Sequence, residues 1–201
     1  NYNTKSQTLR LLVLFPLFIL ISLIKLNFWY RNAYIIFGLF LALLVSVEFF
    51  GISISGSKRW ISLYLFNLQP SELMKVALII FLSKYYHRLS YEDANEIKFL
   101  LVPFFVISIP MFLIIRQPDL GTALLIGAGG LIMIWLAGLK IKYFVYMTIT
   151  FLSLAPIAII FLEPYQKLRI LTFFNPERDP LGAGYQIIQS KIAIGSGGLF
   201  G

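Results

Sequence analysis

The sequence predicts an all-α, polytopic transmembrane helical bundle. Of the 201 residues, 59% are hydrophobic and only 13% are charged. A soluble domain has about 25% charged residues, because polar groups must cover its surface. The apolar residues also fall into runs close to the ~20 residues that an α-helix needs to cross a bilayer. These two observations exclude a water-soluble globular domain.

Six apolar segments are expected to cross the membrane, all within one membrane domain, 1–201. Pro70 and Ser71 mark a helix start at the third segment. Because the chain does not begin with Met and stops in a glycine-rich stretch, we expect a piece of a longer protein, with a seventh helix beginning near Gly184. The six segments are Leu9–Leu26, Ala33–Ile54, Ser71–Tyr86, Phe99–Ile115, Leu120–Gly138 and Tyr143–Leu162.

Composition excludes several kinds of site. Cysteine is absent, so there is no disulfide, thiolate zinc site or cysteine nucleophile. The single histidine excludes a histidine-rich metal cluster. The formal net charge of +8 comes from bases spread over loops between apolar runs. This distribution suits lipid headgroups or an anionic lipid substrate better than a nucleic acid.

Because successive spans alternate in direction, the loops fall into two sets. With the flanking Lys25 and Lys84 included, lysine and arginine number seven in the first set, against six in the second, so the positive-inside rule does not orient the chain. An outward face normally carries few bases, so bases there indicate an anionic ligand. We interpret the bases of the second set in this way and assign the first set to the cytoplasm. The first set comprises Asn27–Asn32, His87–Lys98 and Leu139–Lys142, and the second comprises Gly56–Pro70, Arg116–Asp119 and Glu163–Ala183.

Charged residues at the ends of spans are the first candidates for function. Glu72 and Lys75 are three residues apart, so they share a helix face and can pair or line a polar cavity. A structural ion pair is the alternative. Asp119, before Leu120, is either a helix N-cap or a site residue. Glu48, deep in the second predicted span, is expected to be protonated or internally hydrogen-bonded.

The long loop Glu163–Ala183 is the second candidate region. Loops longer than about 12–15 residues tend to be functional or disordered. A carboxylate flanked by arginine, next to a glycine-rich turn, could act as a general base. A solvated charged loop is the alternative.

Five segments hold the sequence motifs: Gly56–Ile61, Gln69–Lys75, Gln117–Thr122, Asn175–Gln186 and Gln189–Gly198. Together, these segments resemble the SEDS family (shape, elongation, division and sporulation proteins). The resemblance covers the whole chain, and it is closer to the rod-shape branch, RodA, than to the division branch, FtsW. It implies a fold of about ten spans, of which roughly six are present here.

The resemblance implies a peptidoglycan glycosyltransferase of the bacterial cytoplasmic membrane that polymerises lipid II during elongation and shape maintenance. Asp179 matches the family's catalytic aspartate. The implied partners are a class B penicillin-binding protein transpeptidase and other membrane proteins of the elongation complex, with no nucleic acid. No metal ligand set is evident, although a divalent cation could assist the diphosphate. The implied substrate-binding residues are Lys58, Arg59, Gln69, Glu72, Lys75, Arg116 and Asp119.

Two other functions stay open. A flippase or transporter of the lipid-linked precursor needs a polar pathway at membrane depth and no general base, so it would depend on Glu72 and Lys75 more than on Asp179. An inactive truncated scaffold of the wall-synthesis complex would depend on neither.

The alternation of spans predicts that the second set of loops shares one side of the membrane. Single cysteines placed at positions 58 and 178 should react with the same impermeant reagent added from the same side. The cysteine-free chain gives a clean background for this labelling. Reaction from opposite sides would contradict the topology.

Overall fold

The computed structural model describes residues 2–54, 57–62, 67–89, 96–117, 119–146, 149, 153, 164–178 and 182–197. The chain divides into two compact units, Asn1–Phe144 and Val145–Gly201. A single membrane domain over the whole chain therefore remains a prediction.

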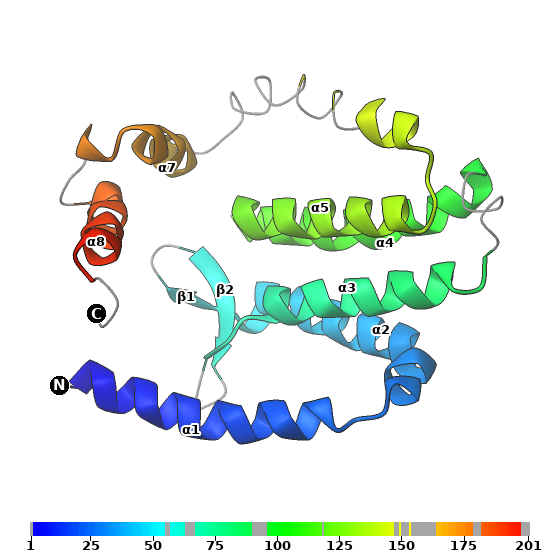
Figure 1. Cartoon of the computed structure of the whole chain (residues 1–201), viewed down its shortest axis with the longest axis horizontal. Coiled ribbons are helices and arrows are strands. Elements are labelled where there is room, and N and C mark those ends of the chain that lie inside the picture. Colours follow the sequence, from blue (N-terminus) through cyan, green and yellow to red (C-terminus); the bar gives the residue numbers. More distant parts are fainter. Residues whose placement is uncertain are drawn as a thin grey trace. The chain divides into compact units, whose positions relative to one another are not determined.

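Long helices make up most of the first unit. Helix α3 packs against α2 on one side and α5 on the other, and α5 packs against α4 (Figure 1). The core between them contains Leu44, Met74, Leu78, Leu82 and Ile126, all at most 1% exposed. Among the described residues, the long helices of this unit are α1 (Tyr2–Ser22), α2 (Leu26–Phe50), α3 (Pro70–Tyr86), α4 (Ile97–Arg116) and α5 (Leu120–Leu136).

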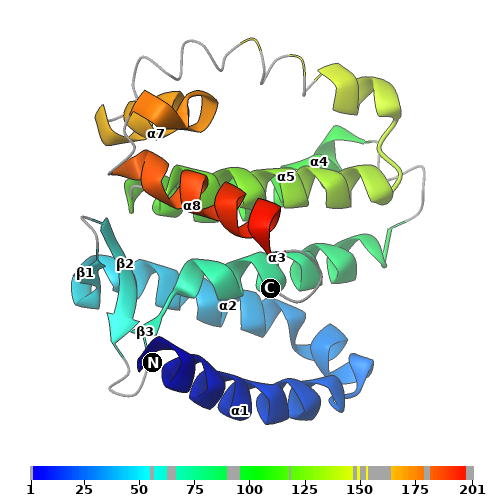
Figure 2. The ribbon, with the colours of Figure 1, turned by 60° about the vertical axis from the view of Figure 1, so that its left-hand side comes forward.

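A small antiparallel sheet lies where α2 ends and α3 begins (Figure 1 and Figure 2). Its strands, in spatial order, are β1 (Ile52–Ile54), β2 (Ser57–Ser62) and β3 (Asn67–Leu68). The sequence predicts the second span and a loop here, so the helical prediction for Ile52–Ile54 is wrong. Gly51 permits the change of direction, because an added Cβ would lie 2.3 Å from the Val47 carbonyl oxygen and 3.0 Å from Lys58 Cγ.

The helix bounds predicted for the third and fourth segments are confirmed to within two residues by α3 and α4, and α5 ends at Leu136, two residues before the predicted end. Other boundaries were wrong. Helix α1 ends at Ser22, and α2 already begins at Leu26. The predicted connector Asn27–Asn32 is therefore helical, and the Asn32 side chain donates to the Phe28 carbonyl within it. Polar residues there indicated a loop, but three residues are enough to join two helices.

Two of the described helices, Leu26–Phe50 and Lys98–Arg116, are long and apolar enough to cross a membrane. Leu11–Ser22 and Leu120–Leu136 are shorter apolar helices. Large hydrophobic side chains remain exposed along the outward faces of these helices, as expected where lipid is the solvent.

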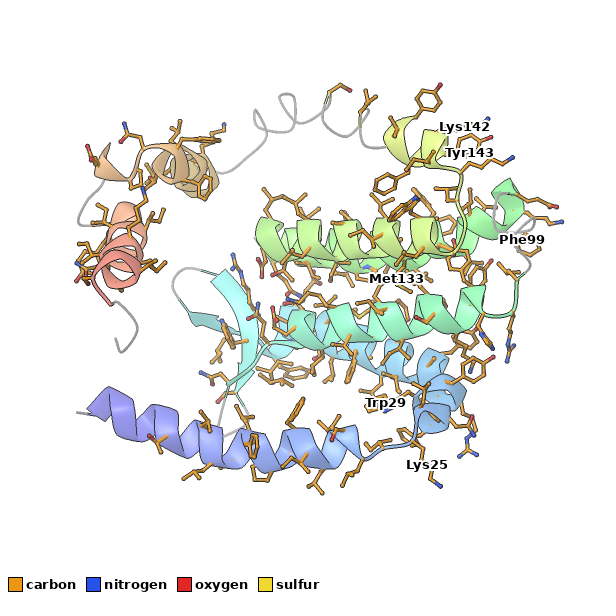
Figure 3. The ribbon with its side chains drawn as sticks, in the orientation of Figure 1. Lys25, Trp29, Phe99, Met133, Lys142 and Tyr143 are labelled. Atoms are coloured by element: carbon orange, nitrogen blue, oxygen red, sulfur yellow. The ribbon has the colours of Figure 1, made fainter. Side chains whose placement is uncertain are left out.

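Basic and aromatic residues gather at the end of the helices remote from the sheet. Figure 3 shows Lys25, Trp29, Phe99, Lys142 and Tyr143 at this end. Such residues are enriched at the boundary between a membrane and water. Within the first unit, the predicted connectors therefore lie opposite the sheet.

The second unit contains a helix where a loop was expected. Helix α7 (Pro164–Phe174) precedes the 3-10 turn η2 (Pro176–Arg178) and α8 (Ala183–Ser196). The loop prediction for Glu163–Ala183 is therefore wrong over Pro164–Phe174, and Pro164 at the first helical position is the signal that could have corrected it. Helix α8 confirms the helix predicted near Gly184. The sixth predicted span lies mostly outside the described residues, although 141–146 are helical.

Two neighbouring glycines test the close packing of α4 and α5. A Cβ added at Gly130 would lie 2.5 Å from Ile107 Cδ1, whereas one at Gly129 would meet nothing within 4 Å. Gly130→Ala should therefore lower the free energy of unfolding by about 1–3 kcal/mol relative to Gly129→Ala, because it overpacks the interface. Both changes gain similar helix propensity, so thermal unfolding in detergent isolates the packing effect. Equal stability of the two variants would contradict this packing.

Candidate functional site

The carboxylate of Asp119 is the centre of the candidate site. Asp119 is the N-cap of α5, and it accepts hydrogen bonds from the backbone N–H of Thr122 (3.3 Å) and the Thr122 hydroxyl (2.9 Å). The N-cap interpretation is confirmed. The Asp119 carboxylate also contacts residues from two other segments.

Gln69 and Arg59 bring those segments to Asp119. Gln69, the N-cap position of α3, makes no cap bond and instead donates from Nε2 to Asp119 Oδ2 at 3.2 Å. Arg59, on β2, lies 3.6 Å from Asp119 Oδ1. The Arg59 and Asp119 side chains are only 16% and 11% exposed, so their pairing matters: a charge removed from water needs a partner.

Gln117 links this cluster to α2. Its backbone oxygen accepts from Arg59 Nε at 3.1 Å, and its buried side chain donates to the Leu44 carbonyl at 3.0 Å. Gln117 and Thr122 were missed as site residues. Both lie with Asp119 in the segment Gln117–Thr122, and this proximity is the signal that the sequence offers.

A second group of charges lies at the end of α2. Lys58 donates from Nζ to the Glu48 backbone oxygen at 2.6 Å, and Arg116 Nε lies 3.5 Å from Glu48 Oε1. Because α2 stops at Phe50, Glu48 is close to a helix end rather than deep in a span. Its carboxylate pairs with Arg116 instead of making the internal hydrogen bond that the sequence predicted. The cations of two motif segments thus meet at one residue of α2.

Glu72 and Lys75 form the predicted ion pair, with Lys75 Nζ 2.8 Å from Glu72 Oε2. The side chains are 54% and 30% exposed, respectively. Lys75 also lines a cavity of about 260 Å³ between α3 and α5, with Leu78, Ile79, Leu125, Ile126 and Gly129. The pairing is therefore present, while a role in substrate binding stays a prediction.

Asp179 lies outside the described residues. Glu177, two residues earlier, is exposed on η2 and contributes to a cavity of about 410 Å³ in the second unit. The catalytic role of Asp179 therefore stays a prediction. The cavity beside η2 is lined by Phe174, Asn175, Pro176, Glu177, Ile188, Lys191 and Ile192.

Metal ligands do not gather in the part of the chain that the structure describes: no group of three or more His, Asp or Glu side chains lies close enough to hold an ion.

Comparison with known proteins identifies the family. The family model for the FtsW/RodA/SpoVE cell cycle proteins matches residues 1–201. The chain belongs to this family. The SEDS resemblance of the motifs is thereby confirmed, because FtsW, RodA and SpoVE are the members that define that family.

Two curated relatives show how the SEDS chain compares with named proteins. A probable peptidoglycan glycosyltransferase FtsW of Buchnera aphidicola subsp. Baizongia pistaciae is 38% identical over 200 residues, which cover 100% of this chain and 52% of the relative. The peptidoglycan glycosyltransferase MrdB of Escherichia coli is 40% identical over 162 residues, covering 79% and 43%. The SEDS chain thus spans about half the length of these relatives.

Solved structures support the polytopic all-α membrane fold. A chain of a peptidoglycan synthase complex that coordinates polymerization and crosslinking matches with a TM-score of 0.72 and 34% identity, over 90% of this chain and 53% of that one. The rod shape determining protein RodA of Thermus thermophilus matches with a TM-score of 0.56 and 25% identity, over 68% and 44%.

Substitutions of Asp119 separate its two roles. Asp119→Asn keeps an oxygen that can cap α5, whereas Asp119→Ala removes the cap. Because Asn and Asp cap about equally well, the Ala variant should be less stable than the Asn variant by about 0.5–2 kcal/mol. Unfolding in mixed micelles measures the difference. Equal destabilisation by both changes would show that the cap adds nothing at this helix.

Proposed function

We propose that the SEDS chain is part of a peptidoglycan glycosyltransferase that polymerises lipid II at the outer face of the cytoplasmic membrane. The observation that carries the proposal is the convergence of motif cations at one end of the helices. Lys58 and Arg116 meet at Glu48, and Arg59 lies beside Asp119. Such a group of cations can stabilise the negative charge that develops on a leaving diphosphate.

In this mechanism Asp179 is the general base. It accepts the proton of the acceptor sugar's 4-hydroxyl while that oxygen forms a bond to the anomeric carbon of the donor. The bond between that carbon and the diphosphate oxygen breaks, and the undecaprenyl diphosphate leaves with the bonding electrons. A sugar hydroxyl is a poor nucleophile at neutral pH, and a positioned base typically accelerates such steps by about 10²–10⁴-fold.

The finer assignment is to elongation and cell shape. It is supported by the segment Asn175–Gln186, which resembles the rod-shape branch, although named relatives from the division branch match at similar identity. A class B penicillin-binding protein is the proposed partner, supported by the similarity to a chain of a peptidoglycan synthase complex. Rescue of rod shape, but not of division, in depleted cells would support the elongation assignment.

A lipid flippase is the second candidate, because the Glu72–Lys75 pair sits at the start of a membrane helix. Apart from Lys75, the cavity beside this pair is lined by apolar residues. Such a lining suits a lipid chain better than a sugar headgroup. Among the described residues, this cavity therefore offers no polar pathway for the headgroup that a flippase must move.

Asp179→Asn tests the proposal directly. The change preserves shape and hydrogen bonding but removes the proton acceptor. In the intact protein with its transpeptidase partner, lipid II should still bind while glycan synthesis falls by about 10²-fold or more. Binding and chain growth are measured separately with labelled lipid II.

Glu177→Gln is the matched control, because it neutralises a carboxylate two residues away and should have little effect. Chain growth at close to the wild-type rate in Asp179→Asn would remove Asp179 from the mechanism. Loss of lipid transport with unchanged polymerisation in a Glu72→Ala variant would favour the flippase instead.

A further inference from the structure

Glu48 holds cations from two motif segments in two different ways. Its carboxylate contacts Arg116 from the end of α4, with 3.5 Å between Nε and Oε1. Its backbone oxygen accepts from Lys58 of β2 at 2.6 Å. Loss or movement of the carboxylate would therefore release Arg116 and leave Lys58 in place.

The contact with Arg116 is easily broken. The Arg116 side chain is 59% exposed and the Glu48 side chain 30% exposed. Exposed ion pairs of this kind contribute little to stability. The pair of Arg59 with Asp119 differs, because both side chains are mostly buried and Asp119 also accepts from Gln69 and Thr122.

We propose that Glu48 is an internal counter-anion that occupies Arg116 until the diphosphate of the lipid-linked substrate displaces it. The inference rests on the proposed function. A diphosphate oxygen pair can bond a guanidinium in a bidentate manner, which a single 3.5 Å carboxylate contact does not match. Displacement of Glu48 leaves Lys58 and Arg116 facing the ligand with two positive charges.

Glu48 thereby sets the affinity for the anionic ligand. Its carboxylate keeps Arg116 paired when no substrate is bound, and it weakens substrate binding by the free energy needed to break this contact. Residues at the ends of membrane helices also meet phospholipid headgroups, whose phosphate is an anion like the diphosphate of the substrate. The test must therefore separate lipid II from bulk anionic lipid.

The experiment is a double-mutant cycle on binding. The intact protein is placed in phosphatidylcholine nanodiscs and titrated with lipid II. Tryptophan fluorescence is the signal, since Trp60 adjoins Arg59 in the same strand. Glu48→Gln should lower the Kd by about two- to fivefold, the range in which exposed ion pairs act. The same change in an Arg116→Gln background should have no effect, because the contact is already absent.

Glu96→Gln is the matched control, since Glu96 forms an exposed pair with Lys98 outside the site and should leave the Kd unchanged. Helical content by circular dichroism confirms that each variant is folded. If Glu48→Gln folds poorly, Arg116→Gln alone still tests the inference, because it should weaken lipid II binding.

Three outcomes would overturn the inference. An unchanged or weaker Kd in Glu48→Gln would show that the carboxylate does not compete. An equal effect with and without Arg116 would indicate a general charge effect. If Glu48→Gln raised the affinity for phosphatidylglycerol as much as the affinity for lipid II, the cations would be assigned to headgroup phosphate. Absence of lipid II binding in the wild type would contradict the proposed function itself, which separates the two failures.

Discussion

The end of the helices at which Arg59, Gln69 and Asp119 meet depends on one carboxylate. Asp119 caps α5 through Thr122, accepts from Gln69 at the start of α3 and lies beside Arg59 of the sheet. Three segments far apart in the sequence are thus held together by an acidic group that is almost removed from water. Because unpaired buried charge is costly, loss of one contact leaves the others strained or the charge uncompensated. Gln117 extends this constraint to α2.

Sequence patterns predicted the parts of the fold that depend on long apolar runs and on local helix signals. Pro70 at the first turn of α3 and Asp119 before α5 marked those helix starts correctly. These signals are local, so one sequence is enough to find them.

Features that depend on tertiary contacts were not predictable in the same way. The sheet at Ile52–Leu68 follows a helix whose end is fixed by Gly51 and the close approach of Lys58. The position of Glu48 was misjudged for the same reason, since its distance from the helix end followed from the wrong boundary. Among the site residues, Arg59, Gln69 and Asp119 were named from the motifs. The resemblance indicated these residues but gave no geometry for their contacts.

The most direct measurement is a double-mutant cycle between Arg59 and Asp119, using Arg59→Gln and Asp119→Asn so that the cap of α5 is kept. The free energy of unfolding of the wild type, both single variants and the double variant gives the coupling energy of the pair. If the pair holds the motif segments together, the coupling should be stabilising and within about 0.5–3 kcal/mol. Strictly additive effects of the two changes would show that the segments meet without depending on this interaction.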